Sequence, residues 1–244
     1  MEKIELKTQD GSLDCYIFKP GEGGKYPVVI MYMDAFGPRT GLFEMCERLT
    51  RNGYFVILPD LYYRGGKYDP FDPKTAFSQP EEKERLMKLM QTTGIAKVMQ
   101  DIASIFEYLD NVPGADSRKV GCVGYCMGGK FSLTAAATFP DRVKAAASFH
   151  GGSLATDKPD SPHLLAGKMY GRIYIGVAGI DHGFTPEEKQ RLEKALKAAE
   201  VNYKLEVYQG ASHGFAVNGT AVFDRVASEQ HWDRLLELFA DTLV

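Results

Sequence analysis

The chain has 244 residues, of which 44% are hydrophobic and 25% charged, a composition that excludes intrinsic disorder and allows a large buried core. Its 29 basic and 32 acidic residues give a formal charge of -3 without any basic block, which argues against nucleic acid or an anionic membrane as partner. Residues 1–18 lack the apolar run of a signal peptide and no later segment has the length of a membrane span, so we expect a cytoplasmic protein, a monomer or small homo-oligomer.

The first part of the chain reads as strands joined by a helix. Residues 4–20 predict a hairpin that turns near residues 10–11. The nearly continuous apolar segments 26–37 and 54–60 predict strands that are covered on both faces. Segment 40–53 between them has helical spacing. Strand, helix and strand therefore follow one another from early in the chain.

Residues 62–93 resist assignment to a regular element, and their prolines and aromatic side chains predict a loop-and-helix excursion at the strand ends, near the active site. A plain surface insertion is the alternative. The alternation of helices and strands resumes afterwards, with helices at 94–110, 186–200 and 221–243 and strands at 119–124, 145–150, 172–179 and 203–210. We therefore expect one α/β domain over residues 1–244, with a mostly parallel central sheet flanked by helices.

The stretch Gly124-Tyr125-Cys126-Met127-Gly128 fits the motif G-x-S-x-G with cysteine in the place of serine, after a predicted strand and before a helix. Glycines leave room for a nucleophile in a strained turn. The N-terminus of the following helix favours a thiolate, and the Met127 N–H can face a developing oxyanion. The alternative is a small cysteine packed in a tight turn.

A nucleophilic thiol needs a base and a group that orients the base. Asp181 follows one predicted strand and His213 follows the next, so the chain order of Cys126, Asp181 and His213 is that of α/β-hydrolases. We expect His182 to be a loop residue, because it lies too close to Asp181 in sequence to serve as the base. His150 is either a pocket residue or a hydrogen-bonded structural histidine.

The motifs "GYCMGG", "GIDHGFTPEE" and "ASHGF", together with "MDAFG" after an early strand, resemble the dienelactone hydrolase family of cysteine-based α/β-hydrolases over nearly the whole chain. The resemblance implies an α/β-hydrolase fold, and cleavage of lactone or ester bonds of the carboxymethylenebutenolidase type, with water as second substrate and no cofactor or metal. It implies Cys126 as nucleophile, His213 as base and Asp181 as acid, with the backbones of Met127 and Ala35 as oxyanion donors.

Two positions depart from the family. Asp34 stands where well-studied members have a glutamate that interacts with the resting cysteine, and Val217 stands where they have an arginine for the substrate carboxylate. We therefore expect better turnover of neutral esters than of an anionic dienelactone, unless Arg39, Arg64, Lys83 or Arg85 supplies another cation. The residues expected near the substrate are Asp34, Phe36, Arg39, Lys83, Arg85, His150 and Val217.

Three other cysteines and two other histidines receive no chemical role. Cys122 is expected in the core, and His163 and His231 at the surface or in helices. Because the four cysteines lack paired C-x-x-C spacing, we expect reduced thiols and no zinc site. Two alternative functions stay open: a broader cysteine-dependent carboxylesterase or thioesterase for neutral esters, and a binding module that keeps the fold without turnover.

Overall fold

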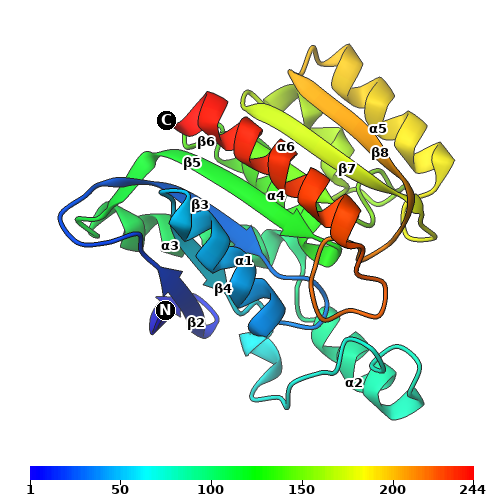
Figure 1. Ribbon diagram of the computed structural model, residues 1–244, viewed down its shortest axis with the longest axis horizontal. Coiled ribbons are helices and arrows are strands. Elements are labelled where there is room, and N and C mark those ends of the chain that lie inside the picture. The colour runs from blue at the N-terminus through cyan, green and yellow to red at the C-terminus, as the bar shows by residue number, and fades with distance from the viewer.

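The computed structural model describes residues 1–244 and has one eight-stranded sheet at its centre (Figure 1). The strands are β1 (Glu2–Thr8), β2 (Gly11–Phe18), β3 (Tyr26–Tyr32), β4 (Phe55–Pro59), β5 (Ala115–Tyr125), β6 (Val143–Phe149), β7 (Arg172–Ile180) and β8 (Tyr203–Ser212). Their order across the sheet is β1-β2-β4-β3-β5-β6-β7-β8. The pairs β1–β2 and β2–β4 are antiparallel and all other neighbours are parallel. The predicted α/β class with a mostly parallel sheet is confirmed.

Helices cover both faces of this sheet. They are α1 (Thr40–Arg51), α2 (Pro80–Met90), α3 (Ile95–Asp110), α4 (Met127–Thr138), α5 (Pro186–Ala198) and α6 (Arg225–Leu243), with short 3-10 helices η1 (Tyr63–Gly65) and η2 (Pro162–Lys168). Figure 1 shows α1 and α6 on one face and α3 and α4 on the other. Every residue of β4 is buried, as a strand covered on both faces requires.

The element boundaries differ from the sequence prediction where a cap or a longer pairing sets them. The last helix begins at Arg225 rather than at residue 221, because the Asp224 carboxylate accepts hydrogen bonds from the N–H groups of Val226 and Ala227. The strand predicted from residue 119 starts at Ala115, because its first residues pair with the beginning of β3.

The segment 62–93 forms η1, an irregular loop and α2, and Figure 1 shows α2 away from the sheet, beyond its strand ends. Arg85 holds this segment together. Its guanidinium donates to the Asp69 carbonyl at 2.7 Å, pairs with Glu82 at 2.6 Å and lies 4.0 Å from the centre of the Phe71 ring. The excursion is thus an ordered substructure.

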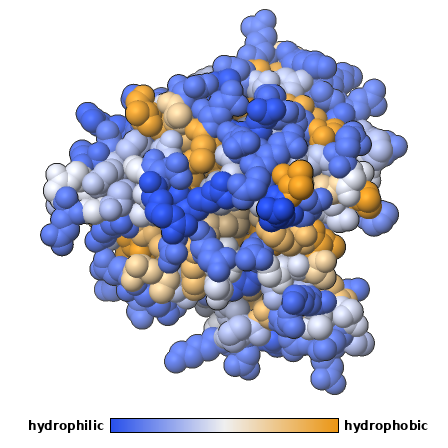
Figure 2. Space-filling model, viewed as in Figure 1, coloured by the Kyte–Doolittle hydropathy of each residue, from blue (hydrophilic) through white to orange (hydrophobic).

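The surface is mixed in character. Figure 2 shows apolar residues interspersed among hydrophilic ones on the face in view. None of the helices combines the length and the apolar composition that crossing a bilayer demands. His163 and His231 both lie in helices, η2 and α6, as the sequence predicts, and both are buried. Nε2 of His231 lies 3.0 Å from the Tyr125 hydroxyl. A histidine on an amphipathic helix does not reveal from its sequence which face it occupies.

The junction of β5 and α4 brings main chains unusually close together. A Cβ atom on Gly128 would lie 2.5 Å from the Tyr32 carbonyl oxygen and 2.7 Å from that of Met33, and a Cβ on Gly124 would overlap the Gly128 carbonyl. No rotamer change relieves such contacts, because the obstacles are backbone atoms. Only glycine therefore allows α4 to start directly against β3.

We predict that Gly128→Ala destabilises the protein by about 1–3 kcal/mol, the usual cost of overpacking. Alanine has the higher helix propensity, so a loss of stability reports the close approach to β3 and not the helix itself. Urea unfolding measures the effect. Gly167→Ala in η2, where a Cβ meets nothing within 4 Å, is the matched control, and equal stabilities of the two variants would contradict the prediction.

Candidate active site

Cys126 occupies the turn between β5 and α4 in a backbone conformation that side chains rarely adopt, with φ 53° and ψ -115°. Its N–H is held by the Phe149 carbonyl at 3.2 Å and by Nδ1 of His150 at 3.2 Å. Cys126 is partly exposed, whereas Cys15, Cys46 and Cys122 are buried. The strained turn therefore presents the one accessible thiol of the chain at the carboxyl end of the sheet.

His150 supports this turn from the end of β6. Burial lowers the pKa of its imidazole well below the usual range, so the ring is neutral, and its hydrogen bond with the Cys126 N–H makes Nδ1 the acceptor and Nε2 the protonated nitrogen. His150 is 1% exposed. Of the two roles that the sequence left open, the structure gives it the hydrogen-bonded structural one.

Asp181 and His213 meet because β7 and β8 are parallel neighbours that end side by side. Nδ1 of His213 lies 2.8 Å from Oδ2 of Asp181, and the other carboxylate oxygen accepts the Gly183 N–H at 2.7 Å. The Asp181 side chain is 2% exposed and that of His213 30% exposed. His182 between them in sequence is exposed and belongs to the loop.

The charge state of His213 depends on its two neighbours. Burial by itself would lower the pKa of the imidazole, but the hydrogen bond to Asp181 and the adjacent Cys126 side chain outweigh it and raise the pKa to about 10. The resting imidazole is therefore protonated at neutral pH. This arrangement is an imidazolium between a carboxylate and a thiol group, the pattern of an activated sulfur nucleophile.

Ala35 and Met127, the expected oxyanion donors, are connected by a residue that the sequence did not single out. The hydroxyl of Tyr62 donates to the Ala35 carbonyl at 2.6 Å and lies 3.9 Å from Sδ of Met127. The backbone N–H groups of Ala35 and Met127 have no acceptor within the protein, as is normal for the first residue of a helix such as Met127. Both are thus free to bind an external oxygen. The ring of Tyr62 is fully buried, which would favour a core assignment from sequence.

Asp34 does not pair with Cys126. Its two oxygens contact the Arg39 guanidinium at 2.6 and 2.7 Å, and Oδ1 also accepts the Phe36 N–H at 3.0 Å. The two side chains are 3% and 13% exposed, so this is a largely buried, bidentate ion pair. It fixes the loop after β3 that carries Ala35.

The other residues expected near the substrate are dispersed. Val217 is fully buried, and its side chain faces the position of Gly41 in α1, so it does not line an open pocket. Lys83 is exposed on α2 without an ion pair, and Arg85 is used within the excursion. Phe36 follows Ala35 and packs edge-on against Phe77 at a centroid distance of 5.4 Å.

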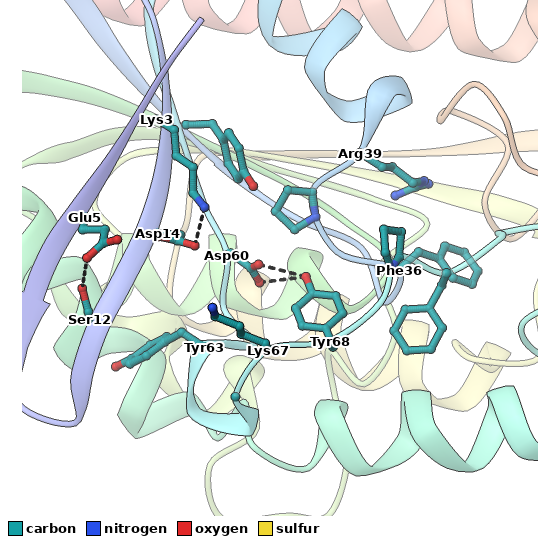
Figure 3. A pocket seen from close by; sticks show the side chains of 15 residues that line it. Lys3, Glu5, Ser12, Asp14, Phe36, Arg39, Asp60, Tyr63, Lys67 and Tyr68 are labelled. Carbon is teal, nitrogen blue, oxygen red and sulfur yellow. Dashed lines mark hydrogen bonds and ion pairs between the residues drawn. The ribbon is translucent and has the colours of Figure 1, made fainter.

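One hollow of the molecule lies away from Cys126. It has a volume of about 550 Å³ and lies against the N-terminal hairpin (Figure 3). Its polar side chains mostly satisfy one another: Lys3 pairs with Asp14, Glu5 accepts from Ser12, and Asp60 accepts from Tyr68. Phe36 and Arg39 form its border toward the Ala35 loop. Since none of Cys126, Asp181 and His213 lines it, the chemistry lies elsewhere.

Comparisons with known proteins agree with this geometry. The model of the "Dienelactone hydrolase family" matches residues 13–243. A protein of Synechocystis sp. named "Putative carboxymethylenebutenolidase" is 28% identical over 98% of this chain and 96% of its own. A crystal structure described as "Putative Dienelactone Hydrolase" from Klebsiella pneumoniae is 24% identical with a TM-score of 0.85, covering 98% of this chain and 97% of that one. Another, a dienelactone hydrolase-like promiscuous phosphotriesterase from metagenomic libraries, is 20% identical with a TM-score of 0.74, over 100% and 99% of the two chains. The expected α/β-hydrolase fold is confirmed.

We predict that Asp181→Asn lowers the pKa of His213, because the hydrogen bond that raises it becomes weaker, and reduces turnover by a factor on the order of 10² to 10⁴. An NMR titration of the His213 ring and steady-state kinetics measure the two effects. His182→Ala is the control and should cost little. Equal losses from both variants would show that the roles on this loop are misassigned.

We predict that Tyr62→Phe lowers kcat by on the order of tenfold with little change in KM, less than the 10² to 10³ lost with an oxyanion donor itself. The substitution removes one hydroxyl and leaves Ala35 and Met127 less firmly placed. Tyr63→Phe is the matched control, because the Tyr63 hydroxyl bonds to Thr8 and Asp101 away from Cys126. A rise in KM with unchanged kcat would assign Tyr62 to substrate binding instead.

Proposed function

This chain belongs to the dienelactone hydrolase family, and we propose that it hydrolyses carboxylic ester or lactone bonds through a covalent intermediate on Cys126. The single observation that carries the proposal is the contact of His213 with Asp181 on one side and Cys126 on the other. Nucleophile, base and orienting acid come from the ends of three strands, β5, β7 and β8. Such a constellation is recognised by geometry and role.

The proposed reaction begins with attack of Cys126 Sγ on the carbonyl carbon. The carbonyl oxygen becomes an oxyanion that accepts hydrogen bonds from the Ala35 and Met127 N–H groups. When the intermediate collapses, the carbon–oxygen ester bond breaks, the leaving alkoxide takes a proton from His213 Nε2, and a thioester remains. In a lactone, the alcohol stays attached to the acyl group, so ring opening releases nothing.

Water completes the cycle. His213 takes a proton from water as the oxygen attacks the thioester carbon, and the second tetrahedral intermediate expels the Cys126 thiolate with the carboxylic acid product. The contribution of Cys126 to the pKa of His213 is absent in the thioester, because the sulfur is then bonded to the acyl carbon. The imidazole is therefore protonated while Cys126 is free. It is more readily a free base in the thioester, when water must be activated.

The two alternative functions differ in how far the site supports them. A broader carboxylesterase or thioesterase would use every one of the same residues, so substrate profiling separates it. A binding module without turnover has no need for unpaired N–H groups at Ala35 and Met127 beside a strained, accessible thiol. The site therefore favours an enzyme.

Three of the four cations proposed to replace the family's arginine are already paired. Arg39 is paired with Asp34, Arg64 with Asp101 and Asp10, and Arg85 with Glu82. Lys83 is exposed on α2. Val217 contributes no charge and is buried. On the basis of these five residues, we still expect the protein to prefer neutral esters.

We predict that iodoacetamide labels Cys126 before the other cysteines and abolishes ester hydrolysis in step with labelling. The reason is accessibility and charge: burial raises the pKa of the thiols of Cys15, Cys46 and Cys122, which keeps them protonated and unreactive. Peptide mapping by mass spectrometry locates the label. Cys126→Ala should remove both the label and the burst of nitrophenol from activated aryl esters. Labelling elsewhere with full activity would refute the role of Cys126.

A further inference from the structure

Lys130 is a partly buried cation without a counter-ion. It lies in α4, one turn after Cys126, and forms no ion pair and no hydrogen bond; its Nζ lies 4.9 Å from the centre of the Phe131 ring. The buried guanidinium groups of Arg39 and Arg64, in contrast, each contact a carboxylate that is at most 3% exposed. Burial lowers the pKa of Lys130, which is the expected response of an ammonium group that has lost water without gaining a partner.

Lys130 lines a small polar cavity of about 190 Å³ between α4, the start of α3 and the loop before η2. Its wall includes the side chains of Thr93, Ser153, Lys158 and Asp160, and only one of its eleven residues is hydrophobic. The charged members are two lysines and one aspartate, and the exposed Asp160 forms no ion pair with Lys130, although it raises the pKa of that lysine. The cavity thus has an excess of positive charge and hydroxyl groups.

Three contacts place this cavity beside the catalytic residues. The Thr93 hydroxyl lies 3.5 Å from Sδ of Met127. The N–H of Gly152, next to Ser153 in the chain, donates to the Cys126 carbonyl at 3.3 Å. The Ser153 N–H donates to the Gly183 carbonyl, in the loop that carries Asp181. Asp160 and, to a smaller extent, Cys126 act to raise the pKa of Lys130 against the effect of burial.

We propose that Lys130 and this cavity form a binding subsite for a small oxyanion, a carboxylate or a phosphate group. Its first source is a carboxylate on the substrate whose ester bond Cys126 cleaves, a step that rests on the proposed function. Its second source is free inorganic phosphate. Lys130 would replace the arginine that Val217 lacks, but from a different element, α4. The expected preference for neutral esters was based on five other residues and did not take Lys130 into account.

The first experiment compares two activated esters that differ by one charge, the 4-nitrophenyl monoester of adipic acid and 4-nitrophenyl hexanoate. The readout is the kcat/KM of the anionic adipic acid ester divided by that of the neutral hexanoate. In Lys130→Met this ratio should fall by on the order of tenfold or more, the effect of one charged hydrogen bond, and Lys130→Arg should keep it. Lys168→Met, an exposed unpaired lysine in η2, is the matched control. Circular dichroism checks folding, and Lys130→Gln replaces the methionine variant if that one does not fold.

The second experiment needs no turnover. Inorganic phosphate at constant ionic strength should raise the melting temperature of the wild-type protein more than that of Lys130→Met, because only the former binds it. An unchanged ester ratio with a Lys130-dependent phosphate effect assigns the site to free phosphate. A changed ratio assigns it to the substrate.

The inference is overturned if Lys130→Met leaves both the ester ratio and the phosphate effect as they are in the wild type. The inference also fails if Lys130→Met lowers the kcat/KM of both esters equally and leaves the effect of phosphate on the melting temperature unchanged. Lys130 would then act on the nucleophile alone. If the wild type cleaves neither ester, the proposed function fails, and the melting experiment still decides on the oxyanion site.

Discussion

The close approach of α4 to β3 is the constraint on which the rest of the site depends. Because Gly124 and Gly128 have no side chains, the helix starts directly over the carbonyls of Tyr32 and Met33, and Cys126 is forced into its strained turn. The same approach brings the Met127 N–H toward the loop after β3, where Ala35 supplies the second free donor. A methyl group at either glycine would move the helix and separate the two donors. The positions of Cys126, of the proposed oxyanion donors and of Lys130 one turn further along are therefore set by a single packing contact between main chains.

The fold and the positions of Cys126, Asp181 and His213 at strand ends could be predicted from sequence because their signals are local. Apolar runs indicate covered strands, glycines around Cys126 indicate a tight strand–helix turn, and the residues that follow β7 and β8 must lie together once these strands are parallel neighbours. Tyr62, Lys130 and His231 carried no such signal. Tyr62 reads as core, Lys130 as a solvent-facing helix residue and His231 as part of an amphipathic stripe. Their environment is made by segments distant in sequence, so only the assembled structure reveals it. For Val217, the family pattern shows that the arginine is missing but does not predict where the valine side chain points.

Asp34 and Arg39 form a bidentate ion pair on the loop after β3. The charged partner of the Asp34 carboxylate is the guanidinium of the same loop. The structure has it engaged by Arg39 through both oxygens, with Phe36 N–H as a third donor. The pair neutralises both groups and stiffens the loop that carries Ala35. The positive charge that remains unneutralised near Cys126 lies instead on the helix side, at Lys130. The unpaired positive charge near Cys126 thus lies on one side only.

The two imidazoles near Cys126 have opposite electrostatic characters although their rings are only 5.3 Å apart. The pKa of His213 is raised to about 10 and we propose that this ring transfers protons, while burial lowers the pKa of His150, whose Nδ1 accepts the Cys126 N–H. The proposed proton transfer and the support of the Cys126 turn consequently belong to separate rings. An acidification that titrates the surface leaves the anchor of the turn intact, since an imidazole that stays neutral keeps its lone pair for the Cys126 amide. The geometry of the Cys126 turn is in this way independent of the protonation of His213.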